Sequence, residues 1–444
     1  MGYKADQIPG SENRAAAHEA GLKSPSEEVR LESLKRLMED IEKGILPKPP
    51  AGTDVNNHIH TIYSFSPYAP AEAVWRAMNA GLSTAGIMDH DSVSGAQEFL
   101  KAGEITGLSV TVGVECRADF SGTRVEGRRL NNPDQNTIAY MALHGIPHTR
   151  LSEVAAFFKP LIDKRNARNR KMVERINGFL EPFKLSISFD EDVAPLSQAD
   201  KGGSVTERHV LYALSLRLIA VYGKGPSLVS FLKDKLALPV SGKLEGFLTD
   251  EANPHYSYDL LGLLKSSLVE RFYIPATDEC PPVAQVLELA DRVGAISAYA
   301  YLGDVGDSVT GDKKTQTFED SYLELLFEEL YRLGFKAITY MPSRNTLSQM
   351  DRVRGLCDKY GFLQISGEDI NSSRQSFVCE AIRNDYFKNL IDTTWALIGH
   401  ELAATGDLTR SMFSAETIRK YPSLNERIKA YKVIGLEKGR EGEV

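Results

Sequence analysis

Cysteines and long apolar runs are scarce in this chain, and each scarcity argues against a class of protein. The four cysteines, Cys116, Cys280, Cys357 and Cys379, stand far apart and form no CxxC pair. This spacing argues against a disulfide framework and against a structural zinc knot. No apolar run approaches the roughly 18 residues that span a bilayer, and the polar start lacks a signal-peptide core. We therefore expect a cytoplasmic protein with reduced thiols and no membrane association.

An excess of positive charge is also missing. The chain has 52 Lys and Arg against 60 Asp and Glu, a net charge of −8 over 444 residues. Duplex binding depends on neutralising phosphates, so a general nucleic-acid binder is not expected. A small anionic substrate in a local basic pocket stays compatible with this charge. The 42% hydrophobic content predicts an ordinary globular protein. The length of 444 residues predicts two or three domains, or one large domain with an insertion.

The first 50 residues predict a helical arm and a linker. Apolar residues recur at three- and four-residue steps between about residues 25 and 43, where Ser24 or Ser26 can cap the helix start and Gly44 can end it. The segment LPKPPAGTD then breaks the helix. We expect the arm to pack on the main domain or on a partner subunit, and the second arrangement would give a homo-oligomer.

Strand-like and helix-like segments alternate from residue 54 onward. This alternation predicts a parallel sheet, either barrelled or doubly wound, in an α/β domain formed by residues 51–149 and 278–400. Residues 150–277 are mostly helical in pattern and predict a helical insertion. Residues 401–444 predict a helical C-terminal extension.

Two of the nine histidines, His58 and His60, stand one residue apart in the strand-like run NNHIHT. Because a strand repeats every two residues, both imidazoles should point to the same side. Two such imidazoles can clamp a metal ion. They can equally form a half-buried strand face with satisfied hydrogen bonds.

Other predicted strands also end in metal-binding residue types. AGIM is followed by Asp89, His90 and Asp91, SVTVGV by Glu115, and FLQIS by Gly367, Glu368 and Asp369. In parallel sheets the carboxyl ends of the strands form one rim, where active sites lie. An aspartate at a strand end often only caps the next helix. Four strand ends that all carry histidine or carboxylate favour a metal site.

The order of these motifs resembles the PHP (polymerase and histidinol phosphatase) family of metal-dependent phosphoesterases. HIHTIYSFSP, IMDHD and VTVGVE are similar to its HxH, TDHD and GVE motifs, over a region of about residues 54–375. SVTERHVLYAL is similar to the helical insertion of members that act on nucleotides and nucleoside phosphates. The resemblance implies a distorted (β/α)7, TIM-barrel-like fold with this α-helical insertion and with helical N- and C-terminal additions.

The resemblance also implies a ligand set. In the family, the two HxH histidines, the GVE glutamate and a late aspartate share one ion, and the matching residues here are His58, His60, Glu115 and Asp369. Imidazole and carboxylate together suit zinc, manganese or iron better than magnesium. His90 and Asp91 would serve catalysis or a second ion.

This chain departs from the family pattern at several site positions. Phe65 replaces an aspartate, Tyr299 stands at the histidine of the family AHP motif, and Asn371 replaces the last histidine. Tyr299 and Glu368 would line the site and form hydrogen bonds where further ions bind in relatives. One ion is therefore predicted, and the number beyond one stays open.

Phosphate ester hydrolysis also needs cations for the developing negative charge. Arg344 and Arg374 follow predicted late strands, and Arg208 and His209 open a helix of the insertion. All four are candidates to bind the phosphate of a substrate. Arg344 and Arg374 could instead be solvated loop residues, and Arg208 and His209 could instead belong to a plain capped helix.

The sequence thus predicts a hydrolase that uses a metal-activated water on a small phosphate mono- or diester, with a nucleotide-like substrate suggested by the insertion. A metal-dependent amidohydrolase is less compatible, since SAYAYLG and KAITYMP lack the further histidines it needs. The serious alternative is a catalytically silent metal-binding protein with a structural, sensing or partner-binding role. Losses of ligands at Phe65, Tyr299 and Asn371 are typical of such a protein.

Overall fold

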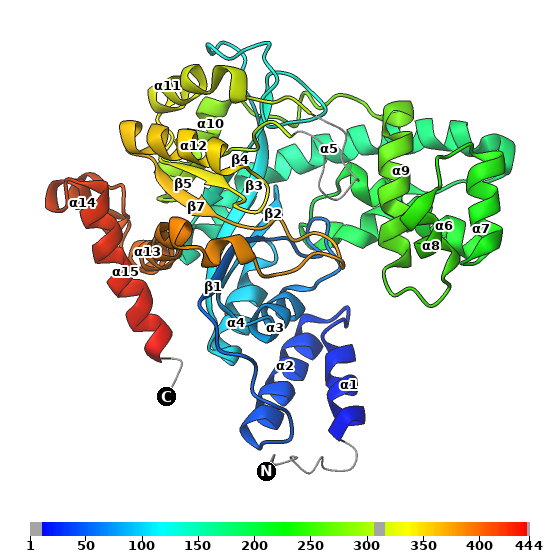
Figure 1. Ribbon diagram of the computed structural model, residues 1–444, viewed down its shortest axis with the longest axis horizontal. Coiled ribbons are helices and arrows are strands. Elements are labelled where there is room, and N and C mark those ends of the chain that lie inside the picture. The colour runs from blue at the N-terminus through cyan, green and yellow to red at the C-terminus, as the bar shows by residue number, and fades with distance from the viewer. Residues whose placement is uncertain (1–10, 306–315, 442–444) are drawn as a thin grey trace.

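The computed structural model describes residues 11–305 and 316–441, and its core is a single curled seven-stranded sheet (Figure 1). The strands follow one another across the sheet in chain order: β1 (Asp54–Ile59), β2 (Leu82–His90), β3 (Ser109–Asp119), β4 (Ile138–His144), β5 (Ile296–Ala300), β6 (Ala337–Tyr340) and β7 (Leu363–Ser366).

Six strands run parallel, as the alternation of strands and helices predicts, but β4 does not. It pairs antiparallel with both β3 and β5. A parallel neighbour needs a crossover, usually a helix, and no helix stands between Asp119 and Ile138. The prediction of a fully parallel sheet was therefore wrong at this strand.

The two edges of the sheet meet at the carboxyl end of β1. Ile59 forms a parallel bridge with Ile370, just after β7, and the His60 backbone N–H donates to the Ile370 carbonyl at 3.0 Å. Gly367 permits this approach, since a Cβ there would lie 2.6 Å from the Cβ of His58. The end of β7 is thus brought directly against the histidines of β1.

Helices cover the sheet and build the other parts of the chain. They are α1 (Ser11–Gly21), α2 (Glu27–Glu42), α3 (Pro70–Asn79), α4 (Ala96–Thr106), α5 (Leu151–Leu180), α6 (Glu207–Tyr222), α7 (Pro226–Ser230), α8 (Gly242–Thr249), α9 (Tyr256–Phe272), α10 (Val283–Val293), α11 (Leu323–Leu333), α12 (Leu347–Tyr360), α13 (Lys388–Gly406), α14 (Ala415–Lys420) and α15 (Leu424–Glu441).

The arm packs on its own chain. Helix α2, capped by Ser26 and ending one residue before Lys43, lies against α3 and α4. Its Arg30 forms a buried two-point ion pair with Glu98 of α4, with contacts of 2.8 and 2.5 Å. Of the two arrangements predicted, the structure shows packing on the main domain. Homo-oligomerisation through the arm stays a prediction.

The insertion has a hydrophobic core of its own. Helices α5 to α9 enclose it and form the lobe at the right of Figure 1. Phe65, from the loop after β1, is the barrel residue that joins this core.

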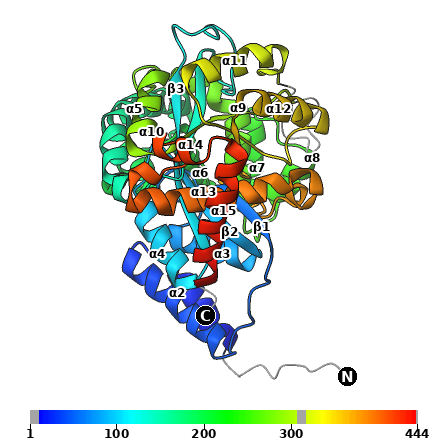
Figure 2. The ribbon, with the colours of Figure 1, turned by 90° about the vertical axis from the view of Figure 1, so that its left-hand side faces the viewer.

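The C-terminal helices lie on the opposite side of the sheet from the insertion, and Figure 2 shows α15 crossing α13 there. Helix α13 contacts β7, β3 and β1. It runs through residue 400, so the predicted domain boundary falls inside a helix. Among the helices described, none is both long and apolar enough to cross a bilayer.

Candidate metal centre

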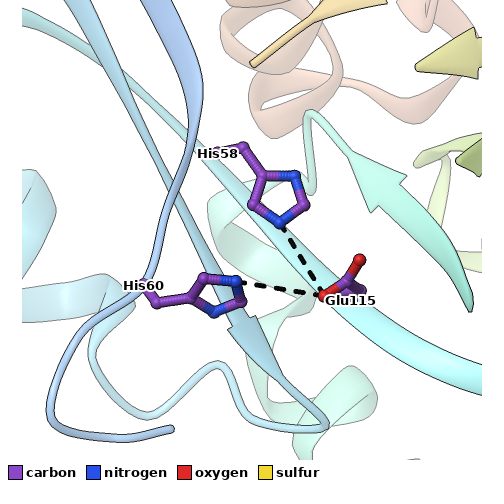
Figure 3. A group of neighbouring side chains, drawn as sticks. All are labelled: His58, His60 and Glu115. Carbon is purple, nitrogen blue, oxygen red and sulfur yellow. Dashed lines mark ion pairs between the residues drawn. The ribbon is translucent and has the colours of Figure 1, made fainter. Parts of the chain in front are cut away.

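Strands β1 and β3 bring His58, His60 and Glu115 together. Both imidazoles point at the Glu115 carboxylate (Figure 3), with Nε2 to Oε2 distances of 3.7 Å from His58 and 3.9 Å from His60. The three candidate ligand atoms lie within 4.8 Å of one another, and all three residues are buried. The period-two argument from the sequence therefore predicted the relative placement of the two histidines.

Among the residues that the structure describes, both Nε2 atoms are buried without a hydrogen-bond partner. The distances to Glu115 are too long for a hydrogen bond, and a buried polar atom left unpaired costs about 1–3 kcal/mol. A cation between the two nitrogens and the carboxylate would satisfy all three groups. The residues present therefore fit a metal ion, and imidazole with carboxylate suits zinc, manganese or iron.

A buried chain of hydrogen bonds sets the tautomer of His60. Asp89 accepts from the Thr61 backbone N–H, the Thr61 hydroxyl and the Ser64 hydroxyl, each at 2.6 Å. The Ser64 hydroxyl has one proton and gives it to Asp89, so its 3.2 Å contact with His60 Nδ1 requires that nitrogen to be the donor. The neutral His60 then presents its Nε2 lone pair to Glu115 and Asp369. A lone pair facing two carboxylates is unfavourable unless a cation lies between them.

Asp369 approaches from the segment after β7. Its Oδ1 lies 3.2 Å from His60 Nε2 and accepts from the Asn371 side-chain amide at 2.6 Å. Glu368, beside it, accepts from the Ser343 hydroxyl at 2.6 Å and keeps its other oxygen unpartnered. Asn371 thus orients Asp369 where the family pattern has a histidine.

His90, at the end of β2, lies beside Glu115 and His60. It pairs in register with Glu115, its Nδ1 lies 3.0 Å from Glu115 Oε2, and its ring centroid is 4.6 Å from that of His60. It is therefore in contact with the candidate ligands. On β4, the ring centroid of Tyr140 lies 5.9 Å from that of His90.

The protonation states fit a site that is short of positive charge. Burial works to raise the pKa of Glu115, but the charges of His58 and His90 outweigh it and hold this pKa far below its usual range. Burial also works to raise the pKa of Asp369, but nearby positive charges, those of His58 and Arg208 among them, hold this pKa well below its usual range. The pKa of His58 is raised because Glu115 outweighs the effect of burial. A bound cation would take the place of the proton that His58 holds when no cation is present.

Asp91 does not face this centre with a free carboxylate. Its Oδ2 forms a buried ion pair with Arg165 of α5 at 2.6 Å. Asp91 lies just after β2 in a left-handed backbone conformation (φ 52°), where the chain turns out of the strand and this carboxylate meets Arg165. Its assignment to catalysis or a second ion finds no support in this contact.

Tyr299 does not line the site, so that prediction was wrong. Along β5, Ala298 packs toward α13, and the next residue, Tyr299, projects into the outer helical layer. The fully buried Tyr299 ring lies 6.4 Å from Phe120 and 6.5 Å from Phe335. Phe65 lies nearer the site but belongs to the insertion core, where its ring is 5.0 Å from His209.

Three of the four residues predicted to bind phosphate have protein partners. His209 Nδ1 accepts from the Thr206 backbone N–H at 2.9 Å and so caps its own helix, and burial lowers its pKa to about 3. Arg344 donates to the Leu302 carbonyl at 3.0 Å. Arg374 pairs with Asp259 of the insertion. These contacts are all ordinary structural ones.

Arg208 is the exception. In the described part of the chain, its guanidinium has neither an ion pair nor a hydrogen bond to another residue. Its charge is among those that lower the pKa of Asp369, after the two histidines. It therefore acts on the metal centre from the start of α6.

Two groups at this centre had no role in the sequence-based prediction. Asp89 was noted only as a strand-end residue, and Ser64 was not noted. A signal was available for Asp89, since it directly precedes His90 on a buried strand and its charge needs donors. Ser64 had no such signal, because its role depends on the path of the loop after β1.

Comparisons with known proteins found one family match and several similar solved structures. Residues 56–183 match the PHP domain family. A structure from Bifidobacterium adolescentis, described provisionally as a metal-dependent phosphoesterase, is 19% identical with a TM-score of 0.48, covering 76% of this chain and 96% of that one. An amidohydrolase from Chromobacterium violaceum, with bound sulfate and no metal, is 16% identical with a TM-score of 0.49, covering 74% and 90%.

No curated protein sequence matches the chain significantly. The family match begins two residues before His58 and extends through α5 of the insertion to Phe183. It contains three of the four strand ends that form the candidate centre. Residues 56–183, with His58, His60, His90 and Glu115 among them, thus match the PHP domain family.

Proposed function

We propose that this protein is a metal-dependent phosphoesterase that hydrolyses a small phosphate mono- or diester. The observation that carries the proposal is the neutral His60, whose Nε2 lone pair is held toward Glu115 and Asp369 by the Ser64–Asp89 hydrogen bonds. Such an arrangement is stable with a cation at its centre. The PHP domain match supports hydrolysis as the purpose of that cation.

In this proposal His58, His60, Glu115 and Asp369 hold one divalent ion, which is zinc, manganese or iron. A bound ion of this kind polarises a phosphoryl oxygen and lowers the pKa of a water to about 7. The protein's task is to fix the ligands and to balance the charge of the substrate. Asn371 holds Asp369, and Asp89 holds His60 through Ser64.

His90 and Arg208 complete the proposed site. His90 lies 3.0 Å from Glu115, so it can hold a proton or take part in binding a second ion. Arg208 has no protein partner in the described residues and is the cation we assign to the phosphate of the substrate. A nucleotide-like substrate is compatible with the two half-buried tyrosines, Tyr212 and Tyr258, that lie beside Phe65.

A metal-binding protein without catalytic activity is the second candidate. It is favoured by the engagement of Asp91, His209 and Arg374 in contacts within the chain. In that case the ion would stabilise the junction of β1, β3 and the segment after β7. The same measurements distinguish the two candidates.

The test combines metal content with turnover. The full chain is stripped with a chelator, reloaded with manganese, zinc or iron, and assayed on p-nitrophenyl phosphate, bis-p-nitrophenyl phosphate and a panel of nucleotides. We expect at least one firmly held ion per chain and metal-dependent turnover, both lost in His58→Ala and kept in the control His18→Ala, whose residue lies in α1. Tight metal binding without turnover on any ester would favour the silent protein, and absence of metal binding would refute both.

A further inference from the structure

Two cations of the insertion, Arg208 on α6 and Lys265 on α9, lie on helix faces that are turned toward the loop after His60. Tyr212 of α6 and Tyr258 of α9 identify these faces, because their ring centroids lie 5.8 and 5.9 Å from that of Phe65. Arg208 is four residues from Tyr212, one helical turn along the same face. Lys265 is seven residues from Tyr258, two turns along the same face.

The start of α6 is anchored next to the metal centre. The Ser204 backbone N–H donates to the Tyr63 carbonyl at 2.7 Å, and Tyr63 precedes the Ser64 that holds His60. The two tyrosine rings of α6 and α9 are 5.0 Å apart, so the helices pack closely at this point. Arg208 and Lys265 therefore extend from neighbouring helices beside the same rim.

Within the part of the chain that the structure describes, neither cation has a direct partner of opposite charge. Over residues 11–305 and 316–441, no ion pair or hydrogen bond joins Arg208 or Lys265 to another residue. The nearby arginines of the insertion differ in this respect, since Arg165 pairs with Asp91 and Arg168 with Glu279. Lys265 is exposed to solvent and Arg208 half-buried, so both can be reached by a ligand.

The two positive charges also act on each other. The guanidinium of Arg208 is the main cause that lowers the pKa of Lys265 to about 8, while the carboxylates of Glu207, Asp134 and Asp369 oppose this shift. Like charges held together destabilise each other unless an anion lies between them. The charge of Arg208 reaches Asp369 as well, so the pair lies next to the candidate metal centre.

We propose that Lys265 and Arg208 form an anion site that binds the phosphoryl oxygens of the substrate and selects phosphate monoesters over diesters. This inference rests on the proposed function and narrows its substrate class. A monoester carries close to two negative charges at neutral pH, whereas a diester carries one. Two neighbouring cations beside a divalent ion match the dianion better.

The test measures binding directly, so that it does not depend on turnover. Inorganic phosphate is titrated into the metal-loaded full chain by calorimetry, for the native protein, Lys265→Met, Lys265→Arg and the control Lys171→Met on the exposed face of α5. We expect phosphate affinity to fall about tenfold in Lys265→Met, the loss of one charge-assisted contact, and to be retained in Lys265→Arg and Lys171→Met. If Lys265→Arg retains the native phosphate affinity, the loss in Lys265→Met comes from the missing positive charge and not from a disturbed fold.

Phosphate affinity is also measured as a function of pH, because a lysine with a purely structural role would not change this dependence. Between about pH 7.5 and pH 9 inorganic phosphate only gains negative charge, so weaker binding must come from the protein. We expect native affinity to fall over this range as Lys265 loses its proton, and Lys265→Arg to be flat or to bind more tightly. In turnover assays Lys265→Met should lower kcat/KM more for a monoester than for a diester.

The outcomes separate this inference from the proposed function. Unchanged phosphate affinity in Lys265→Met, or equal losses for monoester and diester, would overturn the inference and leave metal-dependent ester hydrolysis intact. Phosphate binding that requires Lys265, in a chain that hydrolyses no ester, would overturn the proposed function and support the anion site.

Discussion

Arg374 and Asp259 are joined by a two-point ion pair, with Nε to Oδ1 at 2.6 Å and Nη2 to Oδ2 at 2.7 Å. The pair ties the loop that follows Asp369 to helix α9 of the insertion. A second tie lies beside it, where His255 Nδ1 and the Ser373 hydroxyl are 2.8 Å apart. The insertion therefore supports the candidate metal centre on the Asp369 side as well as through Phe65.

Replacing Arg374 by Met should loosen this loop. Asp259 has only 7% of its side chain exposed and would keep only the Asn253 amide as a donor. Because Arg374 is about a third exposed, we expect a loss of only about 1 kcal/mol in the free energy of unfolding. Faster amide hydrogen exchange in residues 371–377 would show the local effect. The exposed pair of Arg419 and Glu416 gives the control Arg419→Met, and equal effects of the two variants would contradict the expectation.

Asp89→Asn should weaken metal binding although Asp89 is not a proposed ligand. An amide offers one acceptor oxygen in place of two and cannot serve the three donors of Thr61 and Ser64. His60 would lose the contact that fixes its tautomer, and such losses typically lower metal affinity 10–100-fold. Chelator competition measures the change. Asp119→Asn, at the far end of β3, is the control, and unchanged affinity in Asp89→Asn would contradict the role of the chain of hydrogen bonds.

Glu319 should make the protein less stable as pH rises. This fully buried carboxyl accepts from the Leu302 N–H at 2.9 Å, and burial, partly offset by backbone N–H donors, raises its pKa to about 7. In the unfolded chain a glutamate titrates near 4.3. Its contribution to stability is therefore complete below about pH 4.3 and is lost as pH rises toward 7.

The variant Glu319→Gln isolates this effect. The free energy of unfolding of the variant minus that of the native protein should rise by about 2–3 kcal/mol from pH 5 to pH 8. Urea denaturation of both proteins at both pH values measures this difference. A difference between the two proteins that stays constant with pH would show that Glu319 titrates normally.

Gly399→Ala should separate the C-terminal helices. A Cβ at Gly399 in α13 would lie 1.9 Å from the Tyr431 carbonyl oxygen in α15, a backbone atom that cannot move without shifting the helix. We expect a loss of about 1–3 kcal/mol in the free energy of unfolding. Gly355→Ala is the matched control, since that helical glycine has nothing within 4 Å, and it should stabilise by about 0.5–1 kcal/mol. Equal effects would contradict the close crossing.

Much of the candidate centre could be predicted from local patterns. His58 and His60 share a side because they stand two apart at a strand end, and Glu115 meets them because parallel strands end at one rim. Asp369 comes from more than 250 residues further along the chain, and the same rule places it there. The antiparallel β4 was missed because a short apolar strand carries no mark of its direction.

Other residues could not be placed in this way. Tyr299 was expected at the site, but its position in the alternation of β5 turns it outward. Arg374, Asp91 and His209 were expected at a substrate or an ion, and each is bound to another part of the protein. Arg208 carries the same charge as Arg374, but among the described residues it has no ion-pair partner, whereas Arg374 has Asp259.

The sequence by itself determined which ligand types stand at the ends of the strands, because strand period and the common direction of parallel strands need no knowledge of distant contacts. The tertiary structure alone decided which of these polar groups stay free. Whether a charge is available to an ion or a substrate depends on its nearest opposite charge, and Asp259 lies 115 residues from Arg374. Such a pairing is set by how α9 packs over the rim, which no local pattern records.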